Sequence, residues 1–102
     1  MIISKAVDKL QRELEMQITE SSLRFYDMNG YIKLDRSDNT YRDISDKDLI
    51  KLQRILMLSD VNIDLAVVRE ILNDNKEAIK ETVEELRKKS RRIKILLGLY
   101  DN

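Results

Sequence analysis

The sequence contains no cysteine, histidine or proline, and it has only two glycines among its 102 residues. Without cysteine and histidine, the chain lacks thiol nucleophiles, disulfides, the usual ligands of structural zinc and histidine general bases. Carboxylates are plentiful, but neither a nucleophile–base pair nor a glycine-rich phosphate loop accompanies them, so we expect neither an enzyme nor a bound metal or cofactor. The scarcity of chain-breaking residues predicts mostly helix with short connections.

Long apolar runs are also absent, and their absence bears on the expected cellular location of the protein. No uninterrupted apolar stretch approaches the length that spans a membrane. The first ten residues, "MIISKAVDKL", include an early acid and lack the apolar centre of a signal peptide. Charged residues make up 37% of the chain and hydrophobic residues 42%, as in folded helical domains. We therefore expect a cytoplasmic protein with no membrane contact.

Hydrophobic spacing predicts two helices at the start of the chain. A first helix over residues 3–16 has one apolar face, made by Ile3, Val7, Leu10 and Leu14. Thr19 can cap a second helix over residues 20–28. The pair Asn29-Gly30 ends this helix, because both residues tolerate a left-handed backbone.

The middle of the chain predicts a hairpin followed by two further helices. In "YIKLDRSDNTYRDI", residues 31–44, apolar and polar residues alternate around a Ser-Asp-Asn turn. Ser45 with Asp48 forms a capping box for a third helix. Asp64 can cap a short fourth helix. The expected buried stripes of these two helices are Leu49, Leu52, Ile55 and Leu56, and Val67, Val68, Ile71 and Leu72.

The last helix, which Asp74 can cap, has the most regular pattern. Its apolar seam follows spacings of four and three and is interrupted by one serine: Ile79, Val83, Leu86, Ser90, Ile93, Leu97 and Tyr100. So narrow a seam favours pairing with a second copy, and the alternative is packing onto the chain's own domain. The basic run "RKKSRRIK", residues 87–94, favours an antiparallel pair in which it meets the acids between residues 77 and 85. The alternatives are a solvated helix face and a contact with phosphate or an acidic protein.

The order helix, helix, hairpin, helix, helix, long helix is the layout of a winged helix-turn-helix. In that module the second helix enters the major groove, and the hairpin reaches the flanking backbone. We therefore predict a mainly α-helical fold with a short β-hairpin wing in residues 1–73, followed by a dimerisation helix in residues 74–102.

Residues 18–72 resemble the MerR family of transcription regulators. The stretch "ITESSLRFYDMNGYI", residues 18–32, is similar to that family's Leu-Arg-Tyr-Tyr-Glu and Gly-Leu-Ile signature. Its later Arg and Asn-Gly-Tyr-Arg have counterparts in Arg36, Asn39, Tyr41 and Arg42, although Thr40 replaces the glycine. The family's cysteines and its appended drug- or cofactor-binding domain have no counterpart, so we expect a regulator without an effector domain.

The resemblance implies that part of this signature contacts double-stranded DNA. The implied contact residues are Thr19, Ser21, Ser22, Arg24, Tyr26, Arg36, Asn39, Tyr41 and Arg42. An arginine fork can bond a guanine edge or a phosphate, and a tyrosine hydroxyl can bond a phosphate. The alternatives are an Arg24–Asp27 ion pair, a solvated mixed face around the hairpin arginines, and packing of Tyr41 on the third helix.

The three neighbouring aromatic residues need separate roles. Adjacent helical residues point about 100° apart, so Phe25 and Tyr26 cannot both face one groove. We expect Phe25 to pack in the core, Tyr26 to reach outward, and Tyr31 to pack at the base of the hairpin.

These patterns leave two candidate functions. The first is a homodimeric, sequence-specific regulator, either a repressor or a plasmid or phage control factor, that binds a palindromic site through two recognition helices. The alternative is a protein-interaction module, similar to co-chaperone modulators with a degenerate fold of this kind. The formal net charge of zero favours the alternative, and the retained arginines and tyrosines favour DNA.

Overall fold

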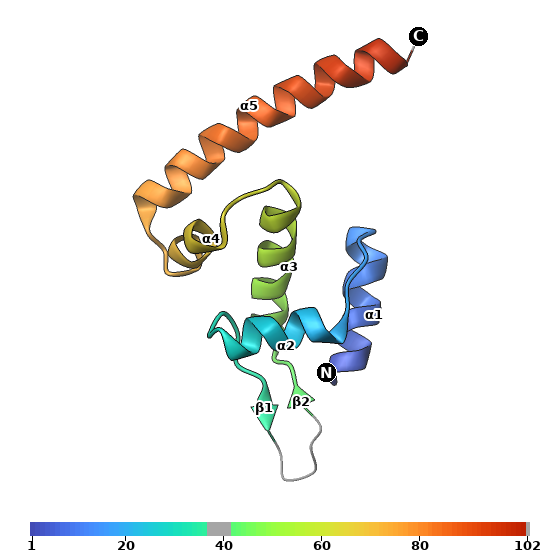
Figure 1. The fold of residues 1–102 in the computed structure, drawn as a ribbon, viewed down its shortest axis with the longest axis vertical. Helices are drawn as coiled ribbons and strands as arrows, with labels where there is room; N and C mark the ends of the chain where they lie inside the picture. The colour runs from blue at the N-terminus through green and yellow to red at the C-terminus, as the bar shows by residue number, and fades with distance from the viewer. Residues whose placement is uncertain (37–41, 102) are drawn as a thin grey trace. The chain divides into compact units, whose positions relative to one another are not determined.

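The computed structural model describes residues 1–36 and 42–101, which form two compact units, Met1–Asn62 and Ile63–Asn102. The first unit contains α1 (Ile3–Leu14), α2 (Glu20–Met28), α3 (Asp46–Asp60) and the two short strands β1 (Asp35–Arg36) and β2 (Arg42–Asp43) (Figure 1). The second contains α4 (Leu65–Leu72) and α5 (Lys76–Tyr100). The predicted mainly helical fold is confirmed. The division after Asn62 groups α4 with α5, whereas the sequence suggested a boundary after residue 73.

The core of the first unit lies among its three helices, with α1 packed on both α2 and α3. Val7 and Leu10 of the predicted α1 face are buried, as are all four residues of the predicted α3 stripe. Ile32, Leu34 and Ile44 extend this core toward the strands. Burial of these side chains removes apolar surface from water, which is the main favourable contribution to folding.

The connection between α1 and α2 is short and internally bonded. Glu15 adopts a left-handed backbone with φ of 52°, so α1 ends at Leu14 and not at residue 16 as its periodicity predicted. The Gln11 side-chain amide then donates to the Ile18 carbonyl at 2.7 Å. These contacts fix the turn of the helix-turn-helix without a glycine.

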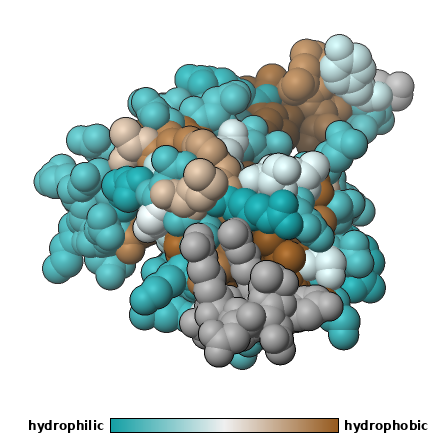
Figure 2. All heavy atoms as spheres, turned by 60° about the horizontal axis from the view of Figure 1, so that its bottom comes forward, coloured by the Kyte–Doolittle hydropathy of each residue, from teal (hydrophilic) through white to brown (hydrophobic). Residues whose placement is uncertain are grey.

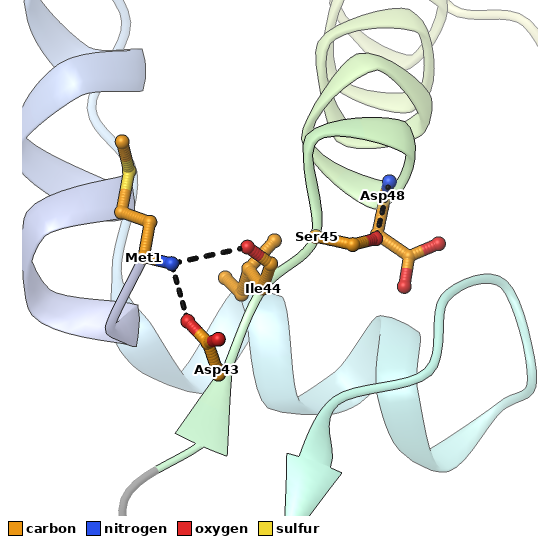
Figure 3. A network of polar contacts seen from close by, with 5 residues as sticks. All are labelled: Met1, Asp43, Ile44, Ser45 and Asp48. Atoms are coloured by element: carbon orange, nitrogen blue, oxygen red, sulfur yellow. Dashed lines mark hydrogen bonds and ion pairs between the residues drawn. The ribbon is translucent and has the colours of Figure 1, made fainter.

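The N-terminal residues run beside the small sheet. The strands β1 and β2 pair antiparallel, with Asp35 opposite Asp43 and Arg36 opposite Arg42. Ile2 forms a further antiparallel bridge to Asp43, and the Ile44 amide donates to the Met1 carbonyl at 2.7 Å. The Met1 α-amino group donates to the Asp43 carboxylate and to the Ile44 carbonyl (Figure 3). The predicted turn, residues 37–39, lies outside the described residues.

The contact between Met1 and Asp43 makes stability depend on pH in the acid range. Hydrogen bonding and attraction to the α-amino group hold the pKa of Asp43 below its ordinary value of 3.8. A carboxyl with a lowered pKa in the folded state stabilises that state above the unfolded pKa, and this contribution is lost as the pH falls through the folded pKa. We expect Asp43→Asn to be slightly less stable than wild type at pH 7, with the difference vanishing in acid. Urea unfolding of the wild type and Asp43→Asn, at pH 7 and at acid pH, measures this difference in stability.

The second unit corrects one predicted helix start. Asp64 caps α4 as predicted, accepting from the Ala66 amide at 3.2 Å. The cap of α5, however, is Asn75, whose side chain accepts from the Ala78 amide at 3.2 Å. Asp74 adopts a left-handed backbone with φ of 59°, whereas a capping residue needs an extended one. Asp74 therefore belongs to the turn between α4 and α5, which pack against each other.

Candidate nucleic-acid interface

The start of α2 is fixed by a side-chain cap that joins two of the predicted contact residues. Thr19 accepts from the Ser22 amide at 3.2 Å, as the sequence predicted, and the two hydroxyls lie 3.0 Å apart. The helix that follows runs Glu20–Met28. The hydroxyls of Thr19 and Ser22 thus lie together at the N-terminal, positive end of the helix dipole, which is favourable for a phosphate.

One side of α2 is left open to solvent. Leu23 is fully buried and marks the core side of the helix. Because successive residues turn by about 100°, the opposite side carries residues two positions away on either side of Leu23. We call the exposed side of α2 its outer face; its members are Ser21, Phe25 and Met28, which point away from Leu23, and Arg24, which lies at the edge of this face. A hydroxyl, a guanidinium and two apolar side chains therefore share one accessible surface.

Arg24 forms an ion pair, but its partner is not the one that the sequence suggested. Its guanidinium lies 3.1 Å from the Glu20 carboxylate, one helical turn earlier, and not against Asp27. Both side chains are about half exposed, and such an i,i+4 surface pair contributes little to stability. The guanidinium can therefore exchange Glu20 for a phosphate or a base edge at small cost.

The aromatic residues are arranged differently from the prediction. Phe25 does not pack in the core, because 47% of it is exposed, and Tyr26 is half-buried. The reason is helical geometry: Tyr26 lies three residues after Leu23 and shares its side, whereas Phe25 lies two residues after it and points away. Tyr31 is buried as expected.

Two carboxylates hold the segment that leads from α2 to β1. Asp27 accepts from the Leu34 amide at 3.0 Å, and Asp48 accepts from the Lys33 amide at 3.3 Å. Asp48 also completes the predicted start of α3, where its own amide donates to the Ser45 hydroxyl at 3.1 Å (Figure 3). These contacts tie the end of α2 and the start of α3 to the strand segment. Sequence reasoning missed the role of Asp27, since no local pattern pairs it with Leu34.

The Asp27 contact predicts a measurable effect on stability. Asp27→Ala leaves the part-buried Leu34 amide without this carboxylate, and a lost hydrogen bond to a charged group costs about 1.5–3 kcal/mol. We expect the free energy of unfolding in urea to fall by about 1–2 kcal/mol, since the site is partly open to water. Asp8→Ala, on an exposed position of α1, is the control and should change it by less than about 0.5 kcal/mol. Equal stability of the wild type and Asp27→Ala would contradict this role.

The predicted wing residues are only partly described. Arg36 and Arg42 occupy paired positions on the two strands, as expected for residues flanking a hairpin turn. Asn39 and Tyr41 lie outside the described residues. Arg36 and Arg42 thus share a register position of the two strands. Of the five predicted residues in or next to α2, Thr19 and Ser22 form its cap, Ser21 and Arg24 are exposed on its outer face, and Tyr26 is half-buried on the side of Leu23.

The predicted seam of α5 is largely open to solvent. Val83, Ile93, Leu97 and Tyr100 are exposed, Ser90 is exposed, and Ile79 and Leu86 are half-buried. Three exposed apolar residues near the end of the helix lie outside this seam and were not singled out from the sequence: Ile95, Leu96 and Leu99. The hydrophobic surface toward the upper right of Figure 2 belongs to this end of α5.

Neither a metal site nor a membrane span is present in the described parts of the chain. No three or more acidic side chains gather there in a way that could hold a metal ion. Among the same residues, no helix combines the length and the apolar character that crossing a bilayer requires.

The arrangement of α1, its turn and α2 defines a helix-turn-helix domain, and comparison with known proteins agrees. The family described as "MerR HTH family regulatory protein" matches residues 7–75. The fold is similar to a crystal structure of HiNmlR, "a MerR family regulator lacking the sensor domain, bound to promoter DNA", with a TM-score of 0.68, 22% identity, and coverage of 96% of this chain and 73% of that one. No curated protein matches.

The chain belongs to the MerR family, because the match spans more than half of its length. It is a DNA-binding transcription regulator of the helix-turn-helix class.

Proposed function

We propose that two copies of this chain bind a palindromic DNA site, each placing the outer face of α2 in the major groove. The observation that carries the proposal is the exposed face of α2 itself, where Arg24 and Ser21 project from a helix whose other side is anchored by buried Leu23. A helix held in this way can present side chains to base edges with little loss of conformational freedom.

The proposed contacts divide into two kinds. Arg24 bonds a guanine edge or a phosphate, while Thr19, Ser21, Ser22 and Tyr26 bond phosphates around it. Four further residues contact the flanking backbone as a wing: Arg36, Asn39, Tyr41 and Arg42. Such phosphate contacts fix the register of the protein on the duplex, and base contacts supply sequence preference.

The charge balance favours recognition of DNA by a few positioned side chains over non-specific electrostatic attraction. Residues 17–54 contain seven basic and seven acidic side chains, so this region has no net positive charge. Because phosphate neutralisation drives non-specific binding and its salt dependence, we infer weak non-specific affinity and a shallow salt dependence. Recognition then depends on a few positioned side chains and on having two half-sites.

The proposed dimer forms through antiparallel α5 helices. The residues that would make the contact are Ile79, Val83, Leu86, Ser90, Ile93, Leu97 and Tyr100, most of which are exposed. In an antiparallel pair, the basic residues 87–94 of one helix face the acidic residues 77–85 of the other, which is favourable. A dimer of this kind sets the spacing of the two recognition helices.

Selection of bound duplexes from a random library tests the function. We expect enrichment of an inverted repeat whose half-site centres lie about one helical turn, or a multiple of it, apart. Failure to enrich any sequence would contradict the proposal.

A second candidate is a protein-interaction module, favoured by the exposed Ile95 and Leu99 beyond the seam. Two-stranded pairing along the seam leaves these side chains uncovered, whereas a protein partner could bury them. The same selection separates the two functions, because a module of this kind would enrich no duplex.

A further inference from the structure

We propose that Phe25, together with Met28, recognises the 5-methyl group of thymine in the major groove. The inference rests on the proposed placement of α2 in that groove and names what its apolar side chains would read. It assigns a role in sequence specificity to Phe25, which the sequence analysis expected in the core.

Phe25 and Met28 both lie on the exposed outer face of α2, on the side away from buried Leu23. They lie three residues apart on the outer face, so their side chains are neighbours on the helix surface. Phe25 is 47% exposed and Met28 is 79% exposed. Ser21 is exposed on the same face, while Arg24 points about 100° from Phe25 and therefore toward one wall of the groove when the apolar pair faces its floor.

The Phe25 ring is held by a row of three aromatic side chains. Phe25 and Tyr26 meet edge to face with ring centroids 5.6 Å apart, and Tyr26 meets Tyr31 in the same way at 5.9 Å. Tyr31 is buried, so the row runs from the interior of the domain to its surface. Edge-to-face pairs contribute about 0.5–1.5 kcal/mol beyond area burial, enough to favour one orientation of an otherwise exposed ring.

The chemistry of the pair fits one group in DNA. Neither a phenyl ring nor a thioether offers a hydrogen-bond donor, so these side chains cannot bond guanine or adenine acceptors. Thymine alone presents a methyl group in the major groove, and apolar side chains distinguish it by contact. The contacted thymine should lie beside the base or phosphate that Arg24 bonds, since the two residues are adjacent on α2.

Deoxyuridine substitution tests the proposal without disturbing any hydrogen-bonding group. Each thymine of a duplex selected by the wild-type protein is replaced in turn by deoxyuridine, which lacks only the methyl group. Loss of one buried methyl weakens binding by about fourfold, and symmetric replacement in both half-sites weakens it by about 15-fold. We expect this loss at one thymine position in each half-site, measured as a change in Kd.

Two variants assign the effect to its residue. Phe25→Ala should bind the thymine and deoxyuridine duplexes with similar affinity, and alanine favours helix at this exposed site, so folding is preserved and can be checked by circular dichroism. Met57→Ala is the matched control, because Met57 is an apolar residue of α3 with 48% exposure, and it should keep the wild-type discrimination.

The possible failures are distinguishable. If no duplex is selected, the proposed function is wrong. If a duplex is selected but deoxyuridine is tolerated at every position, or if Phe25→Ala keeps the discrimination, DNA binding stands and methyl recognition by Phe25 is overturned.

Discussion

Replacing Arg24 with alanine is expected to weaken binding of the selected duplex by about 30-fold or more. A specific arginine contact contributes about 1–3 kcal/mol, and a homodimer makes the contact twice. In the free chain the guanidinium pairs with the exposed Glu20 carboxylate, so the substitution breaks a solvated surface contact and not a buried one. Folding should therefore be unchanged, and the Kd measured by fluorescence anisotropy reports the lost DNA contact.

Arg54→Ala provides the matched control for this experiment. Arg54 is an exposed arginine on α3 and not part of the outer face of α2. Its replacement removes the same single positive charge as Arg24→Ala. We expect at most a few-fold change for this variant, from the loss of long-range attraction. Similar affinities for wild type and Arg24→Ala would contradict the assignment of α2 as the recognition helix.

Introducing charge into the seam of α5 is expected to convert the dimer to a monomer. In the double variant Ile93→Asp/Leu97→Asp, two carboxylates from each chain would be buried against the partner helix, and unpaired buried charge is costly. Both side chains are exposed in the single chain, so its fold should be preserved. Affinity for the palindrome should fall by about 100-fold or more, because each monomer then holds only one half-site.

The control for the seam lies on the same stretch of helix. Ile95→Asp/Leu99→Asp places the same charges on exposed positions outside the seam. Light scattering after size-exclusion chromatography should show a dimer for this control and a monomer for the seam variant. A seam variant that stays dimeric, with unchanged DNA affinity, would rule out pairing through these residues.

Local sequence patterns predicted the helices and most of their caps. Apolar spacing identified the buried stripe of α3, and Thr19, Ser45 and Asp64 were recognised as caps because a side-chain oxygen at each position can bond a nearby amide. The family was also recognisable, because several signature residues recur at the expected order and distance in residues 18–72.

Features that depend on backbone conformation or on distant contacts were not predictable in the same way. Asp74 and Asn75 can both cap a helix, and only the left-handed backbone of Asp74 decides between them. The bonds of Asp27 to Leu34 and of Asp48 to Lys33 join separate elements, so no periodicity reveals them. Phe25 was expected in the core because Tyr26 was expected to reach outward, but the angle of about 200° between buried Leu23 and Phe25 places Phe25 on the outer face.

The stoichiometry of the complex in solution tests the proposed dimeric regulator most directly. Sedimentation of the wild-type chain titrated with its selected duplex should give a complex of two chains and one duplex, with dimers present before DNA is added. A single protomer at working concentration, with no binding to any duplex of the random library, would contradict both the dimer and its function.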